Sequence, residues 1–223
     1  MLSKVNSANY FLGTPAILNY KYSYDNIHDN LNGYLLIKNN NDNIFMLNYK
    51  KNKIYKHNKI QIEFNHLNFI KQIDSFDQNN ILIANKIRIC VLSYCKINNI
   101  NTVLGIGGEY YIYFPFIDAK KYFGISNHKS IIEDAQNICS ENYLVDYNSN
   151  NYPLILTADI IILNVFNIHH KIIEYIKIIK FRRLIIISCN LSDNKLDLLV
   201  KNFKILKIKY FKNFNNWIRV III

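Results

Sequence analysis

The arrangement of apolar and polar positions differs between the first third of this 223-residue chain and the remainder. In the first third, short apolar runs are separated by polar links rich in asparagine, a residue that favours turns. Three of these runs have the length and composition of strands, namely residues 34–38, 44–48 and 59–64. The last run alternates polar and apolar positions, as a half-buried strand does. The pattern therefore predicts a small antiparallel β-rich region over residues 1–75.

Over residues 76–223, helical and strand patterns alternate. Ile83, Ile87 and Val91 recur at helical spacing and predict a helix that ends near residue 98. The strands predicted after it are residues 102–106, 121–125, 143–146, 159–163, 184–188, 205–211 and 217–223. With one crossover helix expected per strand, the pattern predicts an α/β domain with a doubly wound, mostly parallel sheet. The short link before the last strand predicts an antiparallel hairpin at the C-terminal end.

Three glycines gather where the first of these strands ends. Gly105, Gly107 and Gly108 are half of the six glycines in the chain. Glycine tolerates positive φ angles and close backbone approach, so such a turn can present backbone N–H groups to a ligand at the start of a helix. The same glycines can instead close a tight turn without any ligand. The bulky pair Tyr110 and Tyr111 follows directly.

The charge of the chain is strongly positive. There are 27 Lys and Arg residues against 16 Asp and Glu residues, which gives a formal net charge of +11. Such an excess favours RNA or another nucleic acid as a partner, because phosphate contacts and counterion release need only positive charge. The heavy use of Lys, Asn, Ile and Tyr throughout the chain is an alternative cause of the same charge, and a protein partner is a further possibility.

The cysteines and the N-terminal residues bear on metal sites and location. Cys90, Cys95, Cys139 and Cys189 are scattered without Cys-x-x-Cys spacing, so neither a disulfide framework nor a zinc site is expected. His169 and His170 are adjacent and cannot form a metal-binding pair one helical turn apart. No apolar run approaches the roughly 18 residues of a membrane span. We therefore expect a soluble intracellular protein, cytoplasmic, without a metal or membrane attachment.

A parallel sheet followed by an antiparallel hairpin is the plan of the class I S-adenosylmethionine-dependent methyltransferases, and residues 76–223 resemble that family. The order and spacing of the segments are most like the RNA uracil-5-methyltransferases. The resemblance implies a Rossmann-like fold that binds S-adenosylmethionine. The residues that it implies as cofactor contacts are Gly105, Gly107, Gly108, Glu109, Asp146 and Asn164. Cys189, within Ser-Cys-Asn at residues 188–190, matches the family's nucleophile, a thiolate that adds to carbon 6 of uracil.

Several positions depart from the pattern of that family. Gly105 stands where an acidic residue normally follows the first strand, and Gly124 stands where a carboxylate normally holds the ribose hydroxyls. Asn164 begins an Asn-Val-Phe segment in place of Asp-Pro-Pro. Leu191 replaces the proline after Ser-Cys-Asn, and residues 216–218 lack the glutamate that serves as base. Each missing carboxylate is expected to remove charge-assisted hydrogen bonds to the cofactor.

Two functions follow from these residues. The first is a catalytically degenerate methyltransferase-like protein that binds no cofactor and serves as a nucleic-acid-binding, protein-binding or structural component. The alternative is an active S-adenosylmethionine-dependent RNA methyltransferase with Cys189 as nucleophile. Each key residue also has a structural alternative, since Cys189 can be a buried thiol and Asp146 and Asp159 can be solvated carboxylates at strand ends.

Overall fold

The computed structural model of the chain describes residues 34–38, 44–48, 53–55, 59–72, 75, 81–189, 192–213 and 216–223. The chain divides into two compact units, Met1–Asn85 and Lys86–Ile223, which are described separately below. The predicted asparagine-rich turn at residues 39–43 lies outside the described residues, as do Asn190 and Leu191. The predicted domain boundary at residue 75 remains a prediction.

The described residues of the first unit include two groups of antiparallel strands. Strands β1 (Tyr34–Lys38), β2 (Ile44–Asn48) and β3 (Lys53–Tyr55) pair in that order. Strands β4 (Lys59–Phe64) and β5 (Leu67–Gln72) form a hairpin. Asn65 and His66 connect the hairpin with φ angles of 49° and 67°, the left-handed conformation that tight hairpin turns require. The three predicted strands are confirmed, whereas β3 and β5 were not predicted.

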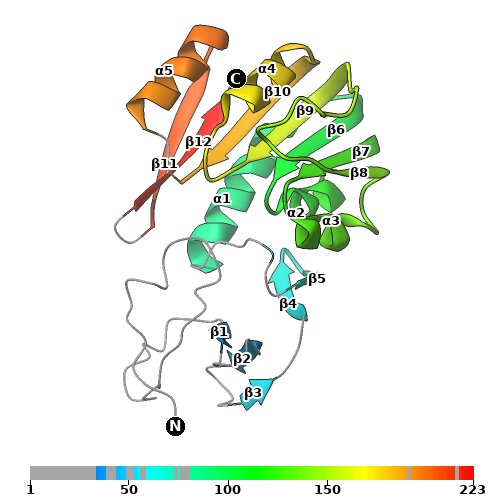
Figure 1. Ribbon diagram of the computed structural model, residues 1–223, viewed down its shortest axis with the longest axis vertical. Coiled ribbons are helices and arrows are strands. Elements are labelled where there is room, and N and C mark those ends of the chain that lie inside the picture. Colours follow the sequence, from blue (N-terminus) through cyan, green and yellow to red (C-terminus); the bar gives the residue numbers. More distant parts are fainter. Residues whose placement is uncertain are drawn as a thin grey trace. The chain divides into compact units, whose positions relative to one another are not determined.

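The second unit is built on one seven-stranded sheet (Figure 1). Its strand order is β11-β12-β10-β9-β6-β7-β8, and every neighbouring pair is parallel except those that involve β12. The strands are β6 (Ile100–Gly107), β7 (Ala119–Ser126), β8 (Glu141–Leu144), β9 (Thr157–Asn164), β10 (Lys180–Ser188), β11 (Lys207–Asn213) and β12 (Asn216–Ile222). The predicted doubly wound, mostly parallel sheet with a C-terminal antiparallel hairpin is therefore confirmed.

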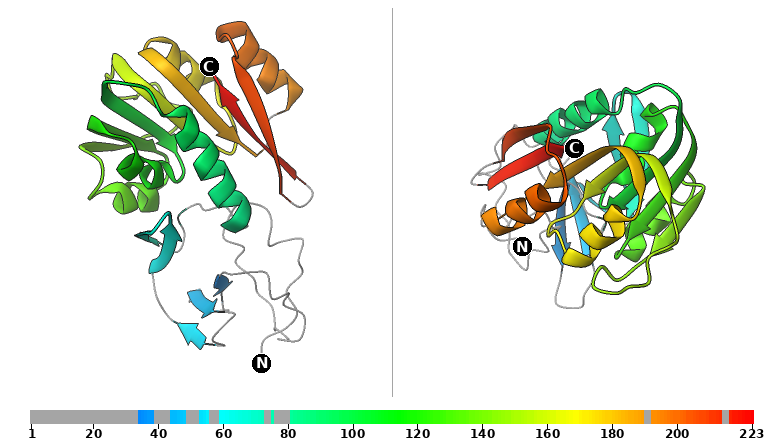
Figure 2. Two further views of the ribbon diagram at one scale, coloured as in Figure 1. Left: turned by 180° about the vertical axis from the view of Figure 1, so that it is seen from behind. Right: turned by 90° about the horizontal axis from the view of Figure 1, so that it is seen from above.

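Helices cover both faces of this sheet. Helix α1 lies on one face, and helices α4 and α5 lie on the other (Figure 2). The helices are α1 (Ile81–Tyr94), α2 (Tyr110–Tyr113), the 3-10 helix η3 (Phe114–Phe116), α3 (Lys129–Ala135), α4 (His170–Lys177) and α5 (Asp193–Asn202). Helix α1 ends at Tyr94, four residues before the end that we predicted. Helices α2 and η3 were not predicted, because apolar aromatic residues at 110–116 read equally well as part of a strand.

The connection from β8 to β9 differs from the expected crossover helix. Residues 145–156 are all described and contain no helix. Asparagine, serine and Pro153 favour turns there, and the apolar side chains of Tyr147 and Ile155 are nevertheless buried. The ring of Tyr152 stacks on that of Tyr175 in α4, with ring centroids 4.5 Å apart. A loop with buried aromatic rings therefore takes the place of one helix.

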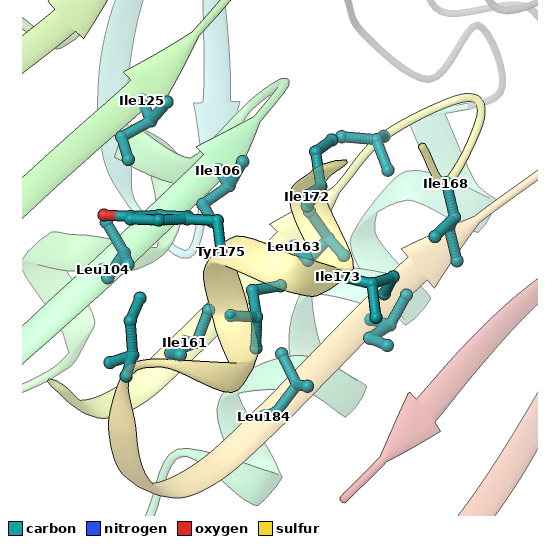
Figure 3. Packing of buried hydrophobic residues seen from close by; sticks show 14 of the residues in the cluster. Leu104, Ile106, Ile125, Ile161, Leu163, Ile168, Ile172, Ile173, Tyr175 and Leu184 are labelled. Carbon is teal, nitrogen blue, oxygen red and sulfur yellow. The ribbon is translucent and has the colours of Figure 1, made fainter. Parts of the chain in front are cut away.

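The main core lies between the sheet and helix α4 (Figure 3). Ile161 and Leu163 of β9 and Leu184 of β10 pack in the same cluster as Ile172 and Ile173 of α4, and all five side chains are fully buried. The intervening residues of β9 are buried as well, because helices cover the other face of the sheet. The nearly continuous apolar run at residues 159–163 is typical of such a central parallel strand.

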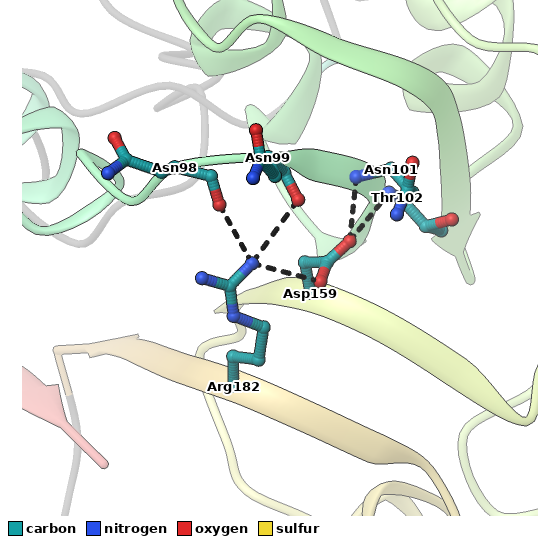
Figure 4. A network of polar contacts seen from close by, with 6 residues as sticks. All are labelled: Asn98, Asn99, Asn101, Thr102, Asp159 and Arg182. Carbon is teal, nitrogen blue, oxygen red and sulfur yellow. Dashed lines mark hydrogen bonds and ion pairs between the residues drawn. The ribbon is translucent and has the colours of Figure 1, made fainter.

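A polar network joins three strands at the amino-terminal edge of the sheet (Figure 4). Asp159 Oδ2 accepts hydrogen bonds from the backbone N–H groups of Asn101 and Thr102, at 2.7 and 3.1 Å. The guanidinium of Arg182 lies 3.3 Å from Asp159 Oδ1 and also donates to the carbonyl of Asn98 at 2.9 Å. Burial raises the pKa of Asp159, but these hydrogen bonds and the charge of Arg182 outweigh it and lower the pKa below its ordinary value. The expectation of a solvated carboxylate is therefore wrong for Asp159.

We predict that Asp159→Asn lowers the free energy of unfolding at pH 7 by about 1–2 kcal/mol, since hydrogen bonds to a charged group are lost. A carboxyl group whose pKa is lower in the folded state stabilises the fold above its unfolded pKa of about 4, and this contribution disappears as the pH falls through the folded pKa. Urea unfolding of both proteins at pH 7 and at pH 2.5 measures the effect. The difference in free energy of unfolding between the two proteins should be smaller at pH 2.5 than at pH 7. A larger difference at pH 2.5 would contradict a lowered pKa for Asp159. Asp146→Asn, at an exposed carboxylate, is the matched control.

Candidate functional site

The predicted site residues meet at the carboxyl-terminal edge of the parallel strands. Gly107 at the end of β6 pairs in register with Asn164 at the end of β9, and Asn164 pairs with Ile187 near the end of β10. Asp146 and Cys189 follow the ends of β8 and β10. Ligands of open α/β sheets bind at this edge, where strand ends and loops converge. The topology therefore brings the glycine turn, Asp146, Asn164 and Cys189 to one edge of the sheet.

The glycine turn is held tightly against β9. Gly107 has a φ angle of +104°, and a Cβ atom there would lie 1.9 Å from the backbone oxygen of Asn164. The N–H of Gly108 donates to that same oxygen at 2.7 Å. Only glycine fits at position 107, and the N–H group of Gly108 is bound within the protein.

Gly105 and Gly124 make room for an aromatic side chain. They are directly paired on β6 and β7. A Cβ atom at Gly105 would lie 2.4 Å from Cβ of Tyr110. A Cβ atom at Gly124 would lie 2.4 Å from the hydroxyl oxygen of Tyr110. Tyr110 is fully buried and donates a hydrogen bond to Asn142 Oδ1 at 3.1 Å. Both glycines are thus explained by the packing of Tyr110.

Strand β7 ends later than predicted. The expected strand over residues 121–125 extends from Ala119 to Ser126, so Gly124 lies within the strand. Its last residue, Ser126, is fully buried, and its hydroxyl accepts a hydrogen bond from the N–H of His128 at 3.2 Å. The extension follows from pairing on both sides of β7, which continues to Ile125 along β6 and to Ser126 along β8. The end of β7 therefore carries a hydroxyl group and no carboxylate.

Glu109 forms a buried ion pair. Its carboxylate oxygen Oε1 lies 2.6 Å from Nη2 of Arg88 on helix α1, and the two side chains are only 3% and 2% exposed. The backbone of Glu109 has a φ angle of 55°, which makes the sharp turn from β6 into α2. Arg88 was not predicted as a partner of Glu109, although an arginine between the apolar positions Ile87 and Val91 indicates a buried, paired side chain. The carboxylate predicted to contact a cofactor is engaged by this arginine.

Buried polar atoms without a hydrogen-bond partner within the described structure occur at the same edge. They include Nδ2 of Asn164 and Oγ of Ser188, at the ends of β9 and β10. Buried polar atoms are normally paired, and each exception calls for an explanation such as a bound group. These donors fit the polar groups of a nucleoside or an amino acid. Among the described residues, the one buried carboxylate next to these strand ends is Glu109, which is paired with Arg88, so the residues fit S-adenosylmethionine only in part.

The remaining predicted residues differ in exposure. Asp146 is exposed, and its Oδ1 accepts a hydrogen bond from the N–H of Asn148 at 2.9 Å, as in an Asx turn. Cys189 is half-buried directly after β10. Cys90 and Cys95 are buried, as expected for structural thiols, and burial raises the pKa of Cys95 to about 12.

The histidines and helices of the described residues were also compared with the requirements of a metal site and of a membrane span. His169 precedes helix α4, and His170 Nε2 lies 3.8 Å from Glu174 Oε1 on the surface of that helix. Among the residues that the structure describes, no three His, Cys, Asp or Glu side chains are placed to hold a metal ion. In the same part of the chain, every helix is too short or too polar to cross a membrane.

Comparisons with known proteins identify the fold. No protein-family model matches the chain, and no curated protein sequence matches it. Among solved structures, it is similar to the Pyrococcus abyssi tRNA (uracil-54, C5)-methyltransferase in complex with S-adenosyl-L-homocysteine, with a TM-score of 0.61 at 14% identity. That match covers 85% of this chain and 50% of the other, so the chain spans half the length of that enzyme.

Two further solved structures are equally similar. The M. jannaschii tRNA m1G37 methyltransferase has a TM-score of 0.60 at 12% identity, with 85% of this chain and 62% of that chain covered. The complex of aTrm5 with tRNALeu has a TM-score of 0.61 at 13% identity, with 92% and 68% covered. At these identities the similarity concerns the fold and does not separate the uracil-5 enzymes from the others. The chain has the fold of the S-adenosylmethionine-dependent methyltransferases.

Proposed function

We propose that this chain is a catalytically silent methyltransferase-fold domain that binds nucleic acid. The observation that carries the proposal is the ion pair between Glu109 and Arg88. Glu109 is the one carboxylate in the segment from β6 to the end of α2, residues 100–113, and it is buried against a guanidinium 2.6 Å away. A carboxylate committed in this way is not available to hold a cofactor. The hydroxyl of Ser126, rather than a carboxylate, at the end of β7 supports the same conclusion.

The nucleic-acid part of the proposal rests on charge and on the structural neighbours. The formal net charge of +11 favours a polyanionic partner. The neighbours include a complex of aTrm5 with tRNALeu and two methyltransferases whose names include tRNA. We propose RNA as the partner, because it agrees with both the positive charge and the structural neighbours.

The alternative function is an active S-adenosylmethionine-dependent RNA methyltransferase. It is favoured by the place of Cys189, half-buried after β10 at the carboxyl-terminal edge, and by the buried donors of Asn164 and Ser188 beside it. In that case Cys189 would act as a thiolate nucleophile toward the pyrimidine ring. Asp146, exposed at the same edge, would be the carboxylate available for the cofactor.

Titration calorimetry of the full chain with S-adenosylhomocysteine separates the two functions. We expect no binding heat at protein concentrations of tens of micromolar. A dissociation constant in the micromolar range would overturn the silent domain and support the enzyme. Fluorescence anisotropy with a labelled single-stranded RNA tests the other half of the proposal, and the affinity should fall steeply between low and physiological salt.

If methyl transfer is detected, Cys189 can be tested directly. The uracil-5 mechanism predicts that Cys189→Ala abolishes transfer, because carbon 5 is not activated without a nucleophile at carbon 6. Cys139→Ala is the matched control, since Cys139 is also partly exposed but precedes β8 at the opposite edge of the sheet. Transfer retained in the Cys189 variant would exclude this residue from the chemistry.

A further inference from the structure

The hairpin formed by β11 and β12 carries an aromatic and basic surface on one face. Tyr210 pairs directly with Arg219, and Lys212 pairs directly with Trp217. Directly paired residues and residues two apart on a strand share a face of the sheet, so these four side chains lie together. We call Tyr210, Lys212, Trp217 and Arg219 the hairpin platform. It lies at the outer edge of the sheet (Figure 1).

The aromatic rings of the platform are unusually accessible. Tyr210 is 55% exposed and Trp217 is 53% exposed. The rings meet edge to face, with centroids 6.4 Å apart and an interplanar angle of 87°. Such a pair covers at most one face of either ring, and about half of Trp217 is exposed, so part of this side chain is accessible to a planar partner.

Positive charge surrounds these rings. The guanidinium of Arg219 lies over the ring of Tyr210, 6.0 Å from its centroid. Lys212 is exposed beside Trp217. Proteins that bind single-stranded nucleic acids combine aromatic rings, on which bases stack, with cationic side chains that contact the phosphates.

The platform is also adjacent to the candidate site. Arg219 pairs in register with Ser188, the last residue of β10, and Cys189 follows Ser188 in the chain. The hairpin pair Asn213 and Asn216 therefore lies toward the same carboxyl-terminal edge as the glycine turn. A strand bound along the platform would reach this edge.

We propose that the hairpin platform binds single-stranded nucleic acid, with a base stacked on Trp217 and phosphate groups on Lys212 and Arg219. The inference rests on the nucleic-acid-binding half of the proposed function and locates that binding on the hairpin platform. A cross-strand aromatic pair can also serve only to stabilise a hairpin. Binding measurements distinguish this role, because stabilisation alone gives no response to oligonucleotides.

Trp217 is the only tryptophan in the chain, so the fluorescence of the unlabelled protein reports on this position. Titration of the full chain with oligo(U), and separately with oligo(dT), should quench the emission in a saturable manner. Trp217→Ala, followed by anisotropy of a labelled oligonucleotide, should weaken binding about 5- to 100-fold, whereas Trp217→Phe should retain most of it. Lys212→Gln should reduce the slope of log affinity against log salt by about 0.7. Leu206→Ala, at an exposed apolar residue before β11, is the matched control.

The outcomes separate the two proposals. Oligonucleotide binding that leaves the tryptophan emission unchanged and is unaffected by Trp217→Ala would overturn the platform and leave nucleic-acid binding intact. Absence of binding in the anisotropy measurement would overturn both. A duplex bound as tightly as the single strand would also overturn the platform, because duplex bases are not free to stack on Trp217. Comparison of the oligo(U) and oligo(dT) titrations shows whether the affinity depends on ribose or deoxyribose.

Discussion

Gly107→Ala is expected to lower the free energy of unfolding by about 3–5 kcal/mol, which combines the cost of overpacking with that of a strained backbone. The new methyl group would lie 1.9 Å from the backbone oxygen of Asn164. That oxygen cannot move aside easily, because it accepts the hydrogen bond of Gly108 and belongs to the central strand β9. The φ angle of +104° adds strain for any residue with a side chain. Urea unfolding monitored by circular dichroism measures the effect.

Gly124→Ala is the matched control for this result. Its Cβ atom would meet side-chain atoms and no backbone atom among its nearest neighbours, namely Oδ1 of Asn142 and the hydroxyl oxygen and Cε2 of Tyr110. We expect a loss of about 1–2 kcal/mol, and less when Tyr110→Phe is introduced at the same time. A urea midpoint for Gly107→Ala equal to that of the wild type would show that the turn is not held against β9.

Glu109→Ala is expected to cost about 3–5 kcal/mol of stability, because removal of one member of a buried ion pair takes away the charge that stabilises the other. Arg88 is 2% exposed and lies on a helix whose neighbouring positions are apolar. Glu109→Gln should cost less, since the amide oxygen can still accept a hydrogen bond from the guanidinium. Urea midpoints of the variants provide the comparison.

Exposed ion pairs provide the control for Glu109. Lys129 Nζ lies 3.7 Å from Glu133 Oε1 on helix α3, with side chains 80% and 43% exposed. Glu133→Ala should change stability by less than about 0.5 kcal/mol. Equal losses for Glu109→Ala and Glu133→Ala would contradict the assignment of a tightly buried pair.

The elements with strong local patterns could be predicted from the sequence. The apolar run at residues 159–163 identified a strand buried on both faces, and the short link predicted at residues 212–216 identified an antiparallel last strand. Strand β8 was placed two residues too late, because its bounds are set by pairing with β7, from Phe123 opposite Glu141 to Ser126 opposite Leu144. Such pairing depends on a neighbour whose register the local sequence does not reveal.

The position of the candidate site in the sheet could be predicted from the sequence, whereas the side-chain contacts of its residues could not. Strand ends and glycines indicated which residues would reach the carboxyl-terminal edge. The partner of Glu109 lies 21 positions away on a helix, and the side chain that fills the space beside Gly105 and Gly124 comes from Tyr110. These contacts arise from packing between elements, which residue spacing along the chain does not determine.

The place of β12 has a consequence for the order in which this unit can fold. Strand β12 lies between β10 and β11, although it follows both in the chain. Among the described strands, β11 has no other neighbour in the sheet, so it can pair only after residues 216–222 have been synthesised. During synthesis from the N-terminus, strands β6 to β10 can assemble first, with one edge of β10 temporarily unpaired. That exposed edge is where a nascent chain would be most vulnerable to wrong pairing, until the last strand closes it.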